Sequence, residues 1–219
     1  MRESLSVFLL SLVVFMLAVG CGGGGGDGGG GAPPPPNYSG TWLFQGNLYV
    51  NDCNVDITNT LTSQPIVSHN GNDVVVVSNK ITLTGKTNAD DGFDVTSTAP
   101  YYITNECACY YAYVFKHASD GNADAGMGMS CGCSGSTQLC TVGYGGTAVR
   151  QSFSTGITIE AASETALDSI ANKFVIKMLE KNSASSTNNV PIESDVLKTT
   201  AIGAANSAII EKSKDESNK

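Results

Sequence analysis

The chain has 219 residues, a length that allows one main domain, or one domain and a smaller appendage. Its 12 Lys and Arg residues are outnumbered by 20 Asp and Glu, and the net charge of −8 argues against a phosphate-backbone partner, so we exclude nucleic-acid binding. With only two histidines and no haem-attachment motif, the sequence offers little material for a His-rich metal site, and we expect no cofactor.

The first 20 residues have the features of an export signal. An apolar run from Leu5 to Val19 is shorter than the stretch of about 20 residues that a membrane-spanning helix needs. It ends in Leu-Ala-Val-Gly-Cys at residues 17–21, which resembles the lipobox of bacterial lipoproteins. That resemblance implies a signal peptide over residues 1–20, diacylglycerol on the thiol of Cys21, and a fatty acid such as palmitate on the new amino terminus. The alternatives are a plain secretory signal or an uncleaved anchor.

Residues 21–37 predict a tether. Nine glycines and one aspartate fill residues 22–31, and four prolines follow at 33–36. Glycine-rich chain has too little apolar surface to offset its ordering entropy, while a proline run is stiff and extended. Gly22 after the cysteine resembles the pattern of lipoproteins sorted to the bacterial outer membrane. We therefore expect membrane attachment through acyl chains on Cys21, with the leaflet and the face left open.

The main domain is expected at residues 38–155, which hold 13 of the 16 aromatic residues and six of the seven cysteines. Period-two alternation predicts antiparallel strands with one buried face. These strands are expected over Trp42–Val50, Cys53–Leu61, Ile81–Thr84, Phe93–Thr98 and Cys109–Phe115. Turns are expected at residues 70–72, 90–92, 120–122 and 145–146, where Gly, Asn and Asp tolerate positive φ.

The segment Val74–Val77 is apolar on both faces, so we expect another element to cover the outside of the sheet there. Short connections predict a meander, and closure would remove the exposed edge strands. The fold class predicted is mainly β, a small antiparallel barrel or sandwich, followed by one or two C-terminal α-helices.

Gly40-Thr41-Trp42 resembles the Gly-x-Trp signature that opens lipocalin-type barrels, and Arg150 lies in the last expected strand. The resemblance implies that this arginine packs across Trp42 and closes the barrel floor. By alternation, however, Val149, Gln151 and Phe153 would face inward and Arg150 outward unless a bulge intervenes. The alternative is that Trp42 is simply a core aromatic. A barrel of this family would hold a small apolar ligand, unless inward-facing side chains such as Tyr111, Tyr113 and Phe115 fill it.

With Cys21 assigned to lipid, an even number of cysteines remains, which in an exported chain predicts disulfides. They are Cys53, Cys107, Cys109, Cys131, Cys133 and Cys140. Two cysteines at positions i and i+2 of a strand cannot comfortably bridge each other. We therefore expect Cys107 and Cys109 to pair with two of Cys131, Cys133 and Cys140, and Cys53 to take the third.

Two metal sites are weaker alternatives. Met127, Met129, Cys131 and Cys133 alternate with other residues and would form a soft ligand row for Cu(I) on a strand, but the intervening glycines favour a loop. Asp120, Asn122 and Asp124 resemble the opening of a calcium loop, although Ala125 and Cys131 occupy positions where such a loop needs glycine and glutamate.

Residues 156–219 predict a helical segment. An amphipathic stripe runs over 161–181, residues 183–189 suggest a linker, and a weaker stripe runs over Ser194–Lys212. Residues 213–219 are expected to be disordered. We expect the helices to pack on the barrel wall, for instance over Val74–Val77, while an apolar face left uncovered would bind a partner.

No nucleophile motif or paired-carboxylate arrangement indicates an enzyme. The function expected is a lipid-anchored, non-catalytic binding or structural module of the cell envelope, with its partner unknown. The alternative is a lipocalin-like carrier of a small apolar ligand. A cavity lined by Trp42, Phe44 and Tyr111 would favour the carrier, whereas a filled interior would favour the surface module.

Overall fold

A computed structural model describes residues 36–78, 80–104, 107–134, 139–151, 173 and 193–218. They belong to one compact unit that begins at Pro36. The expected signal peptide, Cys21, most of the tether and the helix expected over 161–181, apart from Lys173, lie outside the described residues, as do the linker over 183–189 and Phe153.

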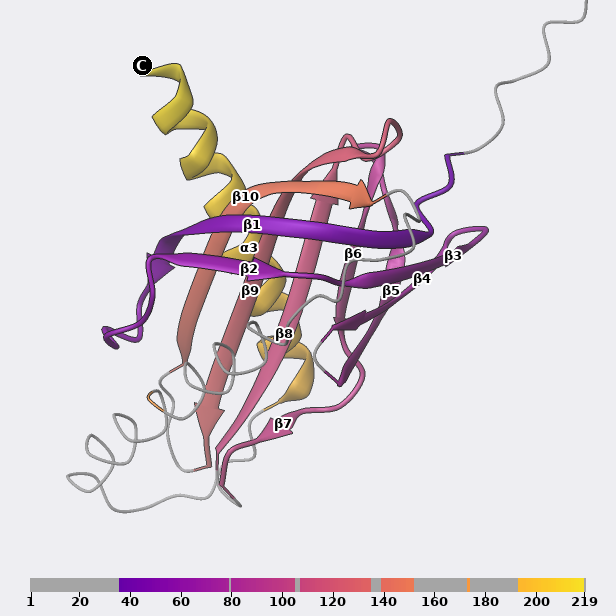
Figure 1. The fold of residues 1–219 in the computed structure, drawn as a ribbon. Coiled ribbons are helices and arrows are strands. Elements are labelled where there is room, and N and C mark those ends of the chain that lie inside the picture. Colours follow the sequence, from indigo (N-terminus) through magenta and orange to yellow (C-terminus); the bar gives the residue numbers. More distant parts are fainter. Residues whose placement is uncertain are drawn as a thin grey trace, which may run out of the picture. The chain divides into compact units, whose positions relative to one another are not determined.

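The described strands form a single antiparallel sheet (Figure 1). Its strands are β1 (Gly40–Asn51), β2 (Thr60–Ser63), β3 (Ile66–Asn70), β4 (Asp73–Ser78), β5 (Ile81–Asn88), β6 (Gly92–Ser97), β7 (Tyr101–Tyr102), β8 (Cys107–Lys116), β9 (Asn122–Cys133) and β10 (Cys140–Gln151). Tight turns join several of them, with positive φ at Gly71 between β3 and β4, at Asp91 between β5 and β6, and at Gly121 between β8 and β9.

The sheet closes on itself because β10 pairs with β9 on one side and with β1 on the other. β2 and β3 both pair with β1, and β6 and β7 both pair with β8, so the wall is an eight-stranded antiparallel barrel. Connections follow chain order around the wall. The mainly β meander predicted from alternation and turn residues is confirmed, and of the two predicted forms, barrel and sandwich, the structure shows the closed barrel. It is consistent with the lipocalin-like barrel that the Gly-x-Trp resemblance implies.

The interior is built in rows across β8, β9 and β10. Tyr113, Met127 and Tyr144 are successive cross-strand partners, all buried and all on the inner face. The two tyrosine hydroxyls have hydrogen-bond partners: Tyr113 Oη lies 2.8 Å from the buried Ser63 Oγ, and Tyr144 Oη donates at 2.9 Å to the carbonyl oxygen of Thr58, in the connection before β2. The hydrogen-bonding capacity of these two hydroxyls is therefore met by the protein itself.

The C-terminal helix α3 (Ser194–Ser217) lies against β8, β9 and β10 (Figure 1). Glycines on the outer face of β9 and β10 permit this approach. A Cβ added at Gly128 would lie 1.9 Å from the carbonyl oxygen of Ala201, and one added at Gly145 would lie 2.2 Å from that of Ala208. The alanine face of α3 thus packs directly on the strand backbone. No helix in the described part of the chain is long and apolar enough to cross a membrane.

Three local predictions for the β domain are wrong. Residues 52–59 form a connection in which Cys53 and Val55 are buried, and only Thr60–Ser63 form a strand. Gly145 and Gly146 lie inside β10, and residues 127–133 lie inside β9. Glycine weakens isolated strands, but here it is required because α3 and the neighbouring strand backbone come too close for a side chain.

The cover expected over Val74–Val77 is also absent. β4 alternates regularly, with Val74 and Val76 buried while Val75 and Val77 are 38% and 43% exposed. The helix lies on the β8–β10 wall instead, where glycines admit it. The disorder expected from residue 213 is wrong as well, because α3 continues to Ser217.

Candidate functional site

The barrel floor is formed around the single tryptophan. Trp42 on β1 and Arg150 on β10 are direct cross-strand partners, and Arg150 Cζ lies 5.9 Å from the centroid of the Trp42 ring. The parity expected for Arg150 is wrong. Pairing with β1 is unbroken from Gln151 to Tyr144, so Arg150 shares the inward parity of Ala148 and Tyr144, and no bulge is needed.

Aromatic rings and the segment before β1 complete the floor. This segment, residues 36–39, is called the floor strap below. The Trp42 indole N–H donates to the carbonyl oxygen of Tyr38 at 2.9 Å, and Phe115 packs edge-on against the indole at 5.4 Å between centroids. Tyr38 Oη donates to Asp91 Oδ1 at 2.9 Å. Burial, followed by this hydrogen bond and the negative charge of Asp91, raises the pKa of Tyr38 to about 12. The first described residues are thereby fixed across one end of the barrel.

The six cysteines among the described residues are joined in three disulfides. Cys107 pairs with Cys133, Cys109 with Cys131, and Cys53 with Cys140. The first two bonds join in-register partners of β8 and β9, whereas the third joins β10 to the connection after β1, over a sequence separation of 87. The predicted arrangement is confirmed: each cysteine of the Cys-x-Cys pair on β8 bonds outside that pair, and Cys53 takes the remaining partner.

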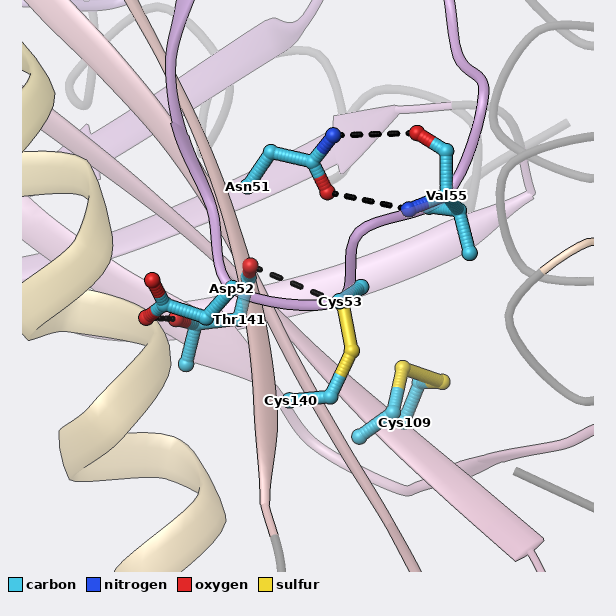
Figure 2. The surroundings of a disulfide bond; sticks show 8 residues. Asn51, Asp52, Cys53, Val55, Cys109, Cys140 and Thr141 are labelled. Carbon is cyan, nitrogen blue, oxygen red and sulfur yellow. Dashed lines mark hydrogen bonds between the residues drawn. A yellow bond between two sulfur atoms is a disulfide. The ribbon is translucent and has the colours of Figure 1, made fainter. Parts of the chain in front are cut away.

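The Cys53 connection is also held by hydrogen bonds (Figure 2). The Asp52 amide donates to the carbonyl oxygen of Thr141 at 3.0 Å, and Thr141 Oγ1 donates to Asp52 Oδ2 at 2.6 Å. The Asn51 side-chain amide donates to the carbonyl oxygen of Val55 at 2.9 Å. The chain around Cys53 is therefore fastened to β10 independently of the disulfide.

A surface hollow of about 380 Å³ lies beside β9 and β10. Its lining consists of His117, Asn122, Ala123, Asp124, Thr147, Ala148 and Val149. Asp124 Oδ1 accepts a hydrogen bond from Lys212 Nζ at 2.8 Å, and Asp124 Oδ2 lies 3.5 Å from His117 Nδ1. The hollow thus borders an ion-pair network that ties α3 to the barrel wall.

These contacts bear on the calcium alternative at Asp120, Asn122 and Asp124. Asn122 and Asp124 belong to β9, not to a loop. One Asp124 oxygen accepts a hydrogen bond from the Lys212 ammonium and the other lies 3.5 Å from the His117 ring, so a Ca²⁺ ion would have to displace both partners. In the described part of the chain, no three His, Cys, Asp or Glu side chains are placed to hold a metal. For the Cu(I) alternative, Met127 to Cys133 do alternate on one face of a strand, but both cysteines are in disulfides and supply no thiolate.

Sequence reasoning missed the His117–Asp124–Lys212 network. His117 and Asp124 flank the turn between β8 and β9, whereas Lys212 lies 88 residues beyond Asp124 and meets it only because α3 packs on β9. Amphipathic spacing in α3 predicts a packing face but not the strands that it covers.

Comparisons with protein-family models, with curated proteins and with solved structures found no match to this chain.

Proposed function

We propose that this protein is a lipid-anchored lipoprotein of the bacterial cell envelope, and that its barrel is a non-catalytic binding or structural module acting through its outer surface. The observation that carries the proposal is the filled interior. Trp42 and Phe44 are completely buried, and a ring with no accessible surface cannot line a cavity that admits even water. The hydroxyl of Tyr113 has a buried partner inside the barrel, Ser63 Oγ at 2.8 Å.

The route of attachment also fits this proposal. In the sequence, the lipobox-like residues 17–21 are followed by the glycine- and proline-rich residues 22–36, and these lead directly into the floor strap. Arg150 Nη1 donates to the carbonyl oxygen of Asn37 at 2.6 Å, and the Tyr38 amide donates to His69 Nδ1 at 3.5 Å. A pull on the tether would therefore be borne by the barrel floor, where side-chain contacts link the strap to β3 and β10. Such an attachment suits a folded module held at a distance from a membrane.

The carrier alternative would need space for an apolar molecule around Trp42, Phe44 and Tyr111. Tyr111 is 3% exposed, and the other two rings are fully buried. Ligand entry would have to displace rings that are already in van der Waals contact, including the T-shaped pair of Phe44 and Tyr113 at 6.0 Å between centroids. We therefore favour the surface module.

Native mass spectrometry of the full chain, expressed in a bacterium with lipoprotein processing and extracted in mild detergent, tests both parts. The expected mass is that of the chain starting at Cys21 with its acyl groups, less two hydrogens for each disulfide, and without bound ligand. A Cys21→Ser variant should lose the acyl mass and leave the membrane fraction. A Ser39→Ala variant, altered outside the lipobox, is the matched control and should remain in the membrane fraction.

Each outcome has a distinct meaning. A non-acylated wild-type chain in the aqueous fraction would refute the anchor while leaving the barrel interpretation standing. An apolar molecule that remains bound in stoichiometric amount and disappears on unfolding would refute the surface module and establish the carrier. Acylated, ligand-free protein is the result that the proposal requires.

A further inference from the structure

Cys131 on β9 lies between two other cysteines in one cross-strand row. Its in-register partner on β8 is Cys109, to which it is bonded, and its in-register partner on β10 is Cys140, which is bonded instead to Cys53. All three side chains of the row are buried on the inner face of the barrel. Two disulfides therefore meet at neighbouring positions of the same row (Figure 2).

A bond between Cys131 and Cys140 would join in-register antiparallel partners, as both β8–β9 disulfides do. Both β8–β9 disulfides join in-register antiparallel partners, each with a Cα–Cα distance of 4.0 Å. Cys131 and Cys140 are also in register, but a strand residue directs its N–H and C=O to one neighbouring strand only, so Cys131 forms the close pair type with Cys109 and the wider, hydrogen-bonded type with Cys140. The Cα atoms of the wider type lie about 5.5 Å apart, which is within the range that a disulfide spans. The backbone can therefore accept a Cys131–Cys140 bond without changing its strand register.

Cys53 is the point of entry to this row. It is 8% exposed, more than any other disulfide-bonded cysteine, and it lies outside the regular strands. The two hydrogen bonds between Asp52 and Thr141 would hold its connection in place after the disulfide opens. The Cys53 sulfur also lies 3.5 Å from the Thr141 carbonyl oxygen, which would accept a hydrogen bond from a free Cys53 thiol.

We propose that Cys53, Cys140, Cys131 and Cys109 form a thiol–disulfide exchange site that takes an external thiol, such as a cysteine-containing peptide or an envelope dithiol protein. The thiolate of the external molecule attacks Cys53 Sγ, forms a mixed disulfide there and releases the Cys140 thiolate. That thiolate attacks Cys131 Sγ, forms the Cys131–Cys140 bond and releases the Cys109 thiolate, which takes up a proton.

The exchange is balanced, and the strands of the barrel remain cross-linked. One disulfide is exchanged at each step, so no net oxidant or reductant is consumed, and the external thiol ends as the mixed disulfide on Cys53. The Cys107–Cys133 bond continues to link β8 with β9, while the new bond links β9 with β10. The outcome differs from simple reduction of Cys53–Cys140, because the free thiol appears on Cys109. This inference does not depend on the surface role proposed above.

A Cys53→Ser variant of the full chain tests the second step alone. Its Cys140 lacks a partner, and exchange should distribute the free thiol between Cys140 and Cys109. After equilibration at about pH 8, the protein is unfolded at acidic pH, where exchange stops, and its thiols are alkylated. The remaining disulfides, including Cys107–Cys133, are then reduced and blocked with a second reagent. Trypsin separates the two sites after that step, because Cys109 lies in the peptide 87–116 and Cys140 in the peptide 117–150.

Because both competing bonds join Cys131 to an in-register neighbour, we expect on the order of one tenth or more of the label on Cys109. The matched control is Cys140→Ser, which leaves Cys53 free and should carry label on Cys53 alone, since Cys53 belongs to no strand row. Label confined to Cys140 in the Cys53→Ser variant would overturn the proposal.

The wild-type protein provides a second measurement if the variants do not fold. Brief exposure to a small monothiol such as glutathione, followed by the same acid quench, should place the mixed disulfide on Cys53 and the alkylated thiol on Cys109. Mixed disulfide on Cys53 with free thiol on Cys140 alone would refute the exchange. Resistance of every disulfide to the thiol in the folded protein would refute the point of entry.

Discussion

Trp42 and Arg150 face each other across the β1–β10 seam, and this pairing places a cation over the indole at the point where the barrel closes. The guanidinium also donates to the carbonyl oxygen of Asn37, so one side chain joins the last strand, the first strand and the strap that enters from the tether. The seam is therefore fastened by side chains as well as by its backbone ladder.

Replacing Arg150 should loosen the floor. An Arg150→Ala variant loses the cation–π contact and the bond to Asn37, and we expect its free energy of unfolding to fall by about 1–2 kcal/mol. Urea titration followed by fluorescence of Trp42, the only tryptophan, measures this loss. The control is Val149→Ala on the outward face, which should change stability by less than about 0.5 kcal/mol. Equal effects of the two substitutions would argue against a closing role for Arg150.

The glycines of β9 and β10 on which α3 packs, such as Gly128, lead to a second prediction. An alanine at Gly128 would place its Cβ 1.9 Å from the carbonyl oxygen of Ala201, so α3 must shift outward, at an expected cost of about 1–3 kcal/mol. Gly203 is the matched control, since it lies on the solvent face of the same helix with nothing within 4 Å of its missing Cβ. Gly203→Ala should stabilise the protein by about 0.5–1 kcal/mol. Thermal unfolding monitored by circular dichroism distinguishes the opposite signs.

Local patterns predicted what depends on local chemistry. The alternation of Tyr111, Tyr113 and Phe115 places one face of β8 inside the barrel, and strand geometry alone restricts which cysteines can pair. Turn residues such as Gly71 marked real hairpins because positive φ is a property of the residue itself.

The predictions that are wrong concern features that depend on contacts between segments far apart in the chain. Gly145 has the composition of a turn, yet it is a strand residue because Ala208 of α3 occupies the space of its side chain. Val75 and Val77 are as apolar as buried strand residues, and nothing near them in sequence shows that α3 covers a different wall. The inward orientation expected for Val149 and Gln151 is wrong, because Arg150 lies on the same face of β10 as the buried Tyr144.

The alternation along β4 gives a third prediction. Val76→Thr places a hydroxyl in the barrel core and should lower the free energy of unfolding by about 1–3 kcal/mol. Val77→Thr makes the same chemical change on the exposed face, where we expect an effect below about 0.5 kcal/mol. Urea titration of both variants decides the matter. A loss at Val77 as large as that at Val76 would mean that the outer face of β4 is covered after all.

The contact between Asp124 and Lys212 predicts how stability depends on pH. Partial burial by itself would raise the pKa of Asp124, but the hydrogen bond and charge of Lys212, with a smaller contribution from His117, lower it below 3.8. A carboxyl whose pKa is lower in the folded than in the unfolded state stabilises the fold above the unfolded-state pKa. That stabilisation is lost as the pH falls through the folded-state pKa.

An Asp124→Asn variant should therefore be less stable than wild type at pH 7, by less than about 1 kcal/mol because the side chain of Asp124 is 40% exposed and screened. The difference between the two proteins should shrink from about pH 5 downward and vanish once Asp124 is protonated in the folded wild type. Urea titrations of both proteins at pH 7, 5, 4 and 3 measure this difference. A constant difference over that range would mean that the asparagine acts through packing and not through the ion pair that holds α3 to β9.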